Sequence, residues 1–171
     1  MDFLEKDLEE IFFECLSNEN GRSQLQERGF YCGGLIGTPK RQLNIGNYGR
    51  ADIVFAAKDV YYSKGDKLDI LNKSINIIEF KKGEIKIESL IQCSRYAKGI
   101  ERWLEIYKPD YDSWTFNIII VGKTINKSDW IYLYNFFDYD RVFIYTYEYK
   151  IDGIYFTEQD LSDYILVNEM L

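Results

Sequence analysis

The chain has 171 residues, of which 46% are hydrophobic and 29% are charged, and its formal net charge is −7. This length suits a single domain with one core, and the composition is that of a soluble globular protein. Because the chain contains no histidine, it cannot use Ser-His or Cys-His nucleophilic pairs. Its three cysteines are too few for a four-ligand Cys/His zinc site.

The cysteines and the hydropathy pattern also predict where the protein works. Cys15, Cys32 and Cys93 are widely spaced and odd in number, which favours free thiols in a reducing cytoplasm. The acidic, amphipathic N-terminal residues are unlike a signal peptide. No apolar run approaches the roughly 18 residues of a membrane-spanning helix. We therefore expect a cytoplasmic protein without a membrane partner, and whether it forms a homo-oligomer stays open.

The N-terminal part of the chain predicts one helix over residues 3–16, with Asp2 as its N-cap. The Asn- and Gly-containing segment 18–21 ends this helix. Residues 22–48 carry the weakest pattern, which favours a short strand near Phe30 and then a loop.

The middle of the chain predicts two strands and a long helix. The strands span residues 51–62 and 75–81, and their connection is longer than a tight hairpin requires, which indicates an inserted turn or an extension of the strands. The helix spans residues 88–107 and ends before Pro109. Its apolar side comprises Leu90, Cys93, Tyr96, Ala97, Ile100, Trp103, Leu104 and Tyr107.

The C-terminal part predicts a buried strand over residues 116–121 and a short helix over residues 129–137. A hairpin of residues 142–149 and 153–156 follows, and a short helix begins at Glu158. This order of elements predicts a single α/β domain over residues 1–171, an α/β/α sandwich around a central mixed sheet.

Three charged residues interrupt the apolar strands. Asp52 lies in the first strand, and Glu79 and Lys81 lie in the second, where residues two apart share one face. Burying such charges is costly unless they are paired or hold a metal. Two carboxylates and a lysine from adjacent strands would bind a divalent cation such as Mg²⁺ or Mn²⁺, which prefers oxygen ligands, and an activated water.

Other interpretations of these residues stay open. Glu79 and Lys81 could form a solvated pair on a half-exposed strand, and Asp59 is an alternative to Asp52. On the following helix, Gln92 and Tyr96 lie one turn apart at the edge of the buried face. They can point into a cleft beside the sheet, although Tyr96 could also be a core aromatic residue.

The combination of Asp52, Glu79-x-Lys81 and Gln92-x-x-x-Tyr96 resembles the PD-(D/E)XK nuclease superfamily, in particular its RecB-like and NucS-like branches. The resemblance covers about residues 3–121, with 122–171 as a C-terminal elaboration. It implies a restriction-endonuclease-like core. It also implies a metal bound by the two carboxylates and a water positioned by the lysine.

The resemblance implies further site residues. The family usually supplies an acidic residue from the first helix, and Glu5 and Glu9 are both candidates, one turn apart on the same face. The family's glutamine and tyrosine contact the water shell of the metal or the substrate backbone. These roles would fall to Gln92 and Tyr96 here.

The charge distribution bears on the substrate. Residues 38–109 hold 14 basic and 9 acidic side chains, whereas both flanking segments are acidic. Candidates for phosphate contacts are Arg50, Lys82, Arg95 and Lys98. The sequence therefore predicts a metal-dependent nuclease acting on DNA, with RNA left open as a substrate. The alternative is a catalytically inactive module of the same fold that binds nucleic acid or serves in assembly.

Overall fold

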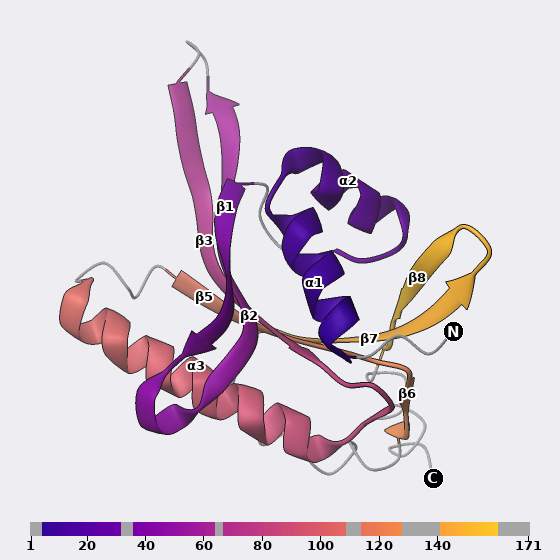
Figure 1. Cartoon of the computed structure of the whole chain (residues 1–171). Coiled ribbons are helices and arrows are strands. Elements are labelled where there is room, and N and C mark those ends of the chain that lie inside the picture. The colour runs from indigo at the N-terminus through magenta and orange to yellow at the C-terminus, as the bar shows by residue number, and fades with distance from the viewer. Residues whose placement is uncertain (1–4, 32–35, 64–66, 109–113, 128–140, 161–171) are drawn as a thin grey trace, which may run out of the picture.

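A computed structural model of the chain describes residues 5–31, 36–63, 67–108, 114–127 and 141–160. Two helices precede a mixed sheet, and a long helix interrupts the strands (Figure 1). In chain order the elements are α1 (Glu5–Leu16), α2 (Glu19–Glu27), β1 (Ile36–Asn44), the 3-10 helix η1 (Gly46–Tyr48), β2 (Arg50–Ser63), β3 (Lys67–Phe80), β4 (Glu84–Ile85), α3 (Ile87–Tyr107), β5 (Trp114–Gly122), β6 (Thr124–Ile125), β7 (Arg141–Lys150) and β8 (Gly153–Glu158).

Six strands form the main sheet in the order β1-β2-β3-β5-β7-β8, and β4 and β6 pair separately. The pairs β1–β2 and β2–β3 are antiparallel, the pairs β3–β5 and β5–β7 are parallel, and β8 is antiparallel to β7. Helix α3 makes the crossover between the parallel strands β3 and β5. Ile53 pairs with Ile78 across β2 and β3, which sets the level at which the charged residues of these strands meet.

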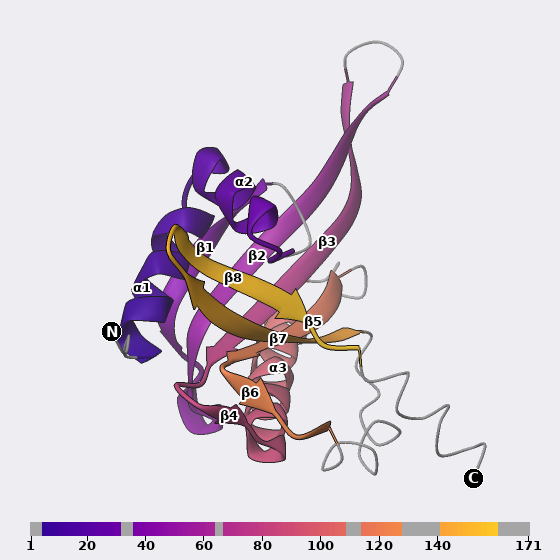
Figure 2. The same cartoon turned by 90° about the vertical axis from the view of Figure 1, so that its right-hand side faces the viewer.

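Helices cover both faces of the sheet (Figures 1 and 2). On one face, Leu8 and Phe12 of α1 belong to the same buried cluster as Phe80 of β3. On the other face, Leu90 of α3 belongs to a second cluster with Ile77. Successive residues of β3 serve opposite clusters because side chains alternate along a strand. The prediction of a mixed α/β protein with a central sheet is confirmed.

Most predicted elements within the described residues are present. The predicted helices correspond to α1 and α3, and the predicted C-terminal hairpin corresponds to β7 and β8. Strands β2 and β3 extend further than predicted, which accounts for the long connection between them. The Asp2 cap and the helix over 129–137 lie outside the described residues. Glu158, expected to begin a helix, ends β8 instead, and residues after 160 are outside the description.

The prediction for residues 22–48 was wrong. This segment contains most of α2 and the whole of β1, and Phe30 lies in neither a helix nor a strand. Helix α2 has only Gly21 and Leu25 buried, so it lacks a strong apolar pattern. Strand β1 lies at the sheet edge and contains Pro39, a residue that central strands exclude.

The apolar side of α3 is narrower than predicted. Its buried apolar residues are Leu90, Cys93, Tyr96, Ala97 and Leu104. Trp103 and Tyr107 are instead 52% and 61% exposed, and their rings contact each other with centroids 5.1 Å apart. Trp103 points away from the sheet because it is rotated by about 100° from its buried neighbour Leu104.

Two predictions from composition concern thiols and membranes. Cys15 and Cys93 are free thiols, whereas Cys32 lies outside the described residues. No helix within the described ranges is long and apolar enough to cross a membrane.

Candidate active site

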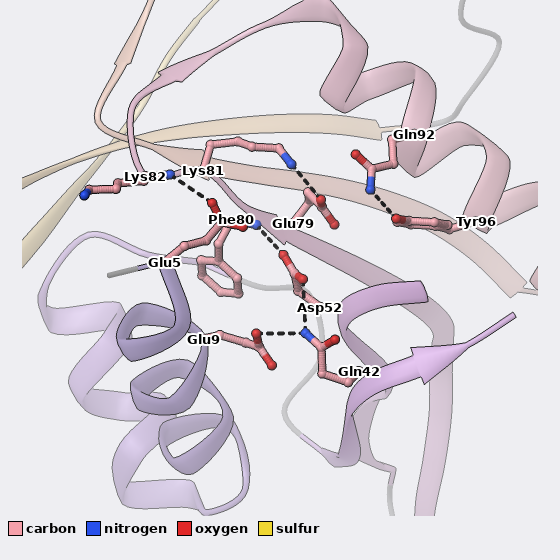
Figure 3. Close-up of polar contacts among 10 residues, drawn as sticks. All are labelled: Glu5, Glu9, Gln42, Asp52, Glu79, Phe80, Lys81, Lys82, Gln92 and Tyr96. Carbon is pink, nitrogen blue, oxygen red and sulfur yellow. Dashed lines mark hydrogen bonds and ion pairs between the residues drawn. The ribbon is translucent and has the colours of Figure 1, made fainter. Parts of the chain in front are cut away.

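The centre of the candidate site is a charged pair at the end of β3. Glu79 is only 3% exposed, and Lys81, two residues later, reaches it with Nζ 2.8 Å from Oε1 (Figure 3). The other carboxylate oxygen of Glu79, Oε2, is buried and has no hydrogen-bond partner. Buried polar atoms are nearly always hydrogen-bonded, so an unpartnered carboxylate oxygen is suited to accept an ion or a water as a further partner.

Asp52 approaches Glu79 from the neighbouring strand. The pairing of Ile53 with Ile78 brings Asp52 to the level of Glu79. The backbone N–H of Phe80 donates to Oδ2 of Asp52 over 2.9 Å. The side-chain amide of Gln42 donates to Oδ1 over 3.2 Å. Asp52 is therefore held by both adjacent strands, while each oxygen keeps a lone pair for a further partner.

Both carboxyl groups are harder to ionise than they would be in water, because of burial and neighbouring negative charge. Burial, followed by the charge of Asp52, raises the pKa of Glu79 to about 7, although Lys81 opposes this shift. Burial also raises the pKa of Asp52, and the acidic residues of α1 add to that effect despite the Phe80 hydrogen bond. Burial alone would lower the pKa of Lys81, but its hydrogen bond to Glu79 raises it above the usual value. Positive charge added near Asp52 and Glu79 would therefore favour the ionised form of both carboxyl groups.

The two candidate acids of α1 have different surroundings. Oε2 of Glu5 accepts a hydrogen bond from the backbone N–H of Lys82 over 3.3 Å, just beyond the end of β3. Both oxygens of Glu9 are engaged by β1, Oε1 by the Arg41 guanidinium and Oε2 by the Gln42 amide over 2.9 Å. The charge of Glu5 raises the pKa of Glu79, so Glu5 lies within electrostatic reach of the β3 carboxyl.

Gln92 and Tyr96 extend the site onto α3. The Gln92 amide donates a hydrogen bond to the Tyr96 hydroxyl (Figure 3). The Tyr96 ring is buried and belongs to the core cluster beneath α3, so it is a core aromatic residue as well as a neighbour of Gln92. Gly49 makes room for this ring, since a Cβ at Gly49 would lie 2.8 Å from it, and its φ of 113° is unfavourable for other residues.

The four candidate phosphate-binding residues are Arg50, Lys82, Arg95 and Lys98, and all are exposed. Lys82 directly follows Lys81, and Arg50 begins β2 two residues before Asp52. Lys98 is instead ion-paired with Glu101 over 2.6 Å. Lys82 and Arg50 are therefore the two candidates that lie beside the charged residues in the chain.

Sequence reasoning missed two residues that touch this site. Gln42 bonds both Glu9 and Asp52. Cys93 of α3 is fully buried, and burial, followed by the charge of Glu79, raises the pKa of its thiol well above the ordinary value. The apolar pattern of α3 marked Cys93 as a core residue, but no sequence signal marked Gln42.

The geometry sets a limit on how a metal could be held. Within the described ranges, no three acidic or cysteine side chains form a group that could hold an ion by themselves. Mg²⁺ is commonly bound by one or two carboxylates, with water and substrate phosphates completing the octahedron. The Asp52 and Glu79 pair, with the unpartnered Oε2, fits that mode of binding. Comparison of the chain with protein-family models, curated proteins and solved structures gave no match.

Proposed function

We propose that this chain is a metal-dependent nuclease that hydrolyses phosphodiester bonds in DNA. The observation that carries the proposal is the buried, unpartnered Oε2 of Glu79 beside a second carboxyl and an ammonium group. A buried carboxylate oxygen without a donor is costly, and a divalent cation would offset that cost. The chain has no histidine, and carboxylates and a lysine are the groups that this site offers for hydrolysis.

The element order supports a restriction-endonuclease-like core for this chain. Helices α1 and α2 are followed by the three antiparallel strands β1 to β3, the crossover helix α3 and the parallel strand β5. The carboxylates lie on the second and third strands of this series. Strands β7 and β8 continue the same sheet beyond β5.

Each site residue has a distinct role in the proposed reaction. Asp52 and Glu79 would hold Mg²⁺ or Mn²⁺, which when bound stabilises negative charge on the phosphate and makes hydroxide available near neutral pH. Lys81 donates a hydrogen bond that orients a water towards phosphorus. The water oxygen forms the new bond to phosphorus and gives its proton to bulk solvent, while the bond between phosphorus and the leaving oxygen breaks and that oxygen takes a proton from solvent.

Glu5 is the better candidate for the acidic contribution of α1. Its carboxylate lies beside the backbone of Lys82 and affects the ionisation of Glu79 and Lys81. Glu9 has both oxygens bonded to β1 side chains and so has less capacity for an ion. Glu9 is better suited to orient the strand than to bind the metal.

The decisive experiment is a cleavage assay on single- and double-stranded DNA and on RNA with Mn²⁺. We expect DNA cleavage by the wild type. Lys81→Met should reduce the rate by about 10²–10³-fold, the range for the loss of one preorganised hydrogen-bond donor, while Mn²⁺ still raises the melting temperature. Asp52→Asn should lose both cleavage and the response to Mn²⁺. An inactive wild type that also ignores Mn²⁺ would disprove the proposal.

A second candidate is a nucleic-acid-binding module that has lost cleavage. The observation that favours it is that no third carboxylate completes a metal site within the described part of the chain. Its signature would be binding of nucleic acid by the wild type without hydrolysis under any divalent cation. The Lys81→Met variant would then bind like the wild type.

A further inference from the structure

Gln42 contacts two carboxylates near the site but has no role in the reaction proposed above. Its side-chain nitrogen lies 2.9 Å from Oε2 of Glu9 and 3.2 Å from Oδ1 of Asp52 (Figure 3). An amide nitrogen carries two hydrogens, so it can donate to both carboxylates at once. Gln42 therefore connects α1 to the carboxyl group of β2.

The backbone of Gln42 is held in an unfavourable conformation. Its φ is 51°, and no other non-glycine residue within the described ranges has a positive φ. A left-handed conformation is uncommon for glutamine, which gains no local hydrogen bond from it. Such strain persists only where surrounding structure imposes it, and it concentrates at functional sites.

Glu9 anchors this connection. It is 6% exposed, and its Oε1 is bonded to the Arg41 guanidinium next to Gln42. On the other side, Asp52 is bonded to the backbone N–H of Phe80, which adjoins Glu79. The hydrogen bonds therefore run from Arg41 through Glu9, Gln42 and Asp52 to β3, which contains Glu79 and ends just before Lys81.

We propose that Gln42 is a positioning residue that orients the Asp52 carboxylate for cation binding by tying it to Glu9. This inference rests on the proposed function, because it assigns Gln42 to the same metal site. Gln42 occupies one lone pair of Oδ1 and the Phe80 N–H occupies one of Oδ2, so both bonds fix the orientation of the carboxylate and each oxygen keeps a lone pair for a cation. Hydrogen-bonding partners of metal ligands typically contribute 10–100-fold in metal affinity or activity.

The test compares three single variants with the wild type. Gln42→Gly removes the amide and relaxes the backbone, since glycine accepts a positive φ. Gln42→Asn keeps an amide and tolerates the left-handed conformation, but its side chain is one methylene shorter. Thr38→Gly is the matched control, because Thr38 is an exposed residue of the same strand without a positive φ. The measurements are the metal-free melting temperature and the Mn²⁺ concentration that gives half-maximal binding by calorimetry.

Both Gln42 variants should melt close to the wild type without metal and need at least about tenfold more Mn²⁺ for half-maximal binding. Thr38→Gly should show the opposite pattern, with a lower melting temperature and unchanged Mn²⁺ binding.

If the wild type binds Mn²⁺ and the Gln42 variants bind it equally well, only this inference is overturned. If the wild type does not bind Mn²⁺, the proposed function fails with it. Loss of the fold in both metal-free Gln42 variants would make Gln42 a structural residue and would also overturn the inference.

Discussion

Ionisation of the buried Glu79 carboxyl group destabilises the folded state. Burial, followed by the charge of Asp52, raises its pKa from 4.5 to about 7. Between these values the folded protein retains a proton that the unfolded chain releases, so this group lowers stability as the pH rises. The penalty is complete above pH 7 and amounts to about 3 kcal/mol for a shift of this size. The raised pKa of Asp52 acts in the same direction.

We therefore expect the metal-free protein to melt at a higher temperature near pH 5 than near pH 8. Glu79→Gln should remove much of this pH dependence and raise the melting temperature at pH 8. It should also abolish the stabilisation by Mg²⁺, which arises from mass action on the folded state. Thermal melts followed by circular dichroism across this pH range measure both effects. Glu88→Gln, at an exposed position in the first turn of α3, is the control and should behave as the wild type.

Sequence reasoning reached the charged residues of β2 and β3 but not Gln42. The alternation of a strand is enough to predict that Glu79 and Lys81 share a face, and an apolar setting marks their charges as unusual. The role of Gln42 depends on a left-handed backbone at an edge strand and on two partners from separate elements. Neither property leaves a periodic signal in the sequence.

At the scale of elements, Asn18 joins the first two helices. Its side-chain oxygen accepts a hydrogen bond from the Gly21 N–H over 2.7 Å, which caps the start of α2. Its side-chain nitrogen donates to the Glu14 carbonyl over 2.9 Å, at the end of α1. The sequence marked this segment only as the end of one helix, because a cap that begins another depends on the apolar pattern that follows, and α2 has little.

Asn18→Ala should lower the free energy of unfolding by about 1 kcal/mol, since it removes an N-cap. Urea unfolding measures this change. Asn20→Ala is a suitable control, because Asn20 is exposed within the first turn of α2 and alanine is the better helix former there. Equal destabilisation by the two substitutions would show that the cap of α2 contributes nothing specific.

At the scale of the whole molecule, the fold redistributes the charges that the sequence places in one basic segment. The Lys123 N–H donates to the Gly83 carbonyl over 2.8 Å, so an exposed lysine outside residues 38–109 lies beside Lys82. Lys108, inside that segment, follows the last residue of the 21-residue helix α3. Helix geometry separates it by about 24 Å from the backbone of Gln92. A lysine's distance from the Asp52 and Glu79 carboxylates should therefore decide whether it contacts a phosphate backbone. Whether it lies within residues 38–109 should matter less.

The last prediction separates these two possibilities. Lys82→Glu should weaken DNA binding to a similar extent for unrelated sequences and reduce the slope of log affinity against log salt by about one, because phosphate contacts carry no base information. Lys108→Glu makes the same change in charge at an exposed position far from the carboxylates and should leave the slope nearly unchanged. Fluorescence anisotropy with labelled duplexes in EDTA measures binding without cleavage. If Lys108→Glu weakens binding as much as Lys82→Glu, DNA does not approach the protein through the end of β3.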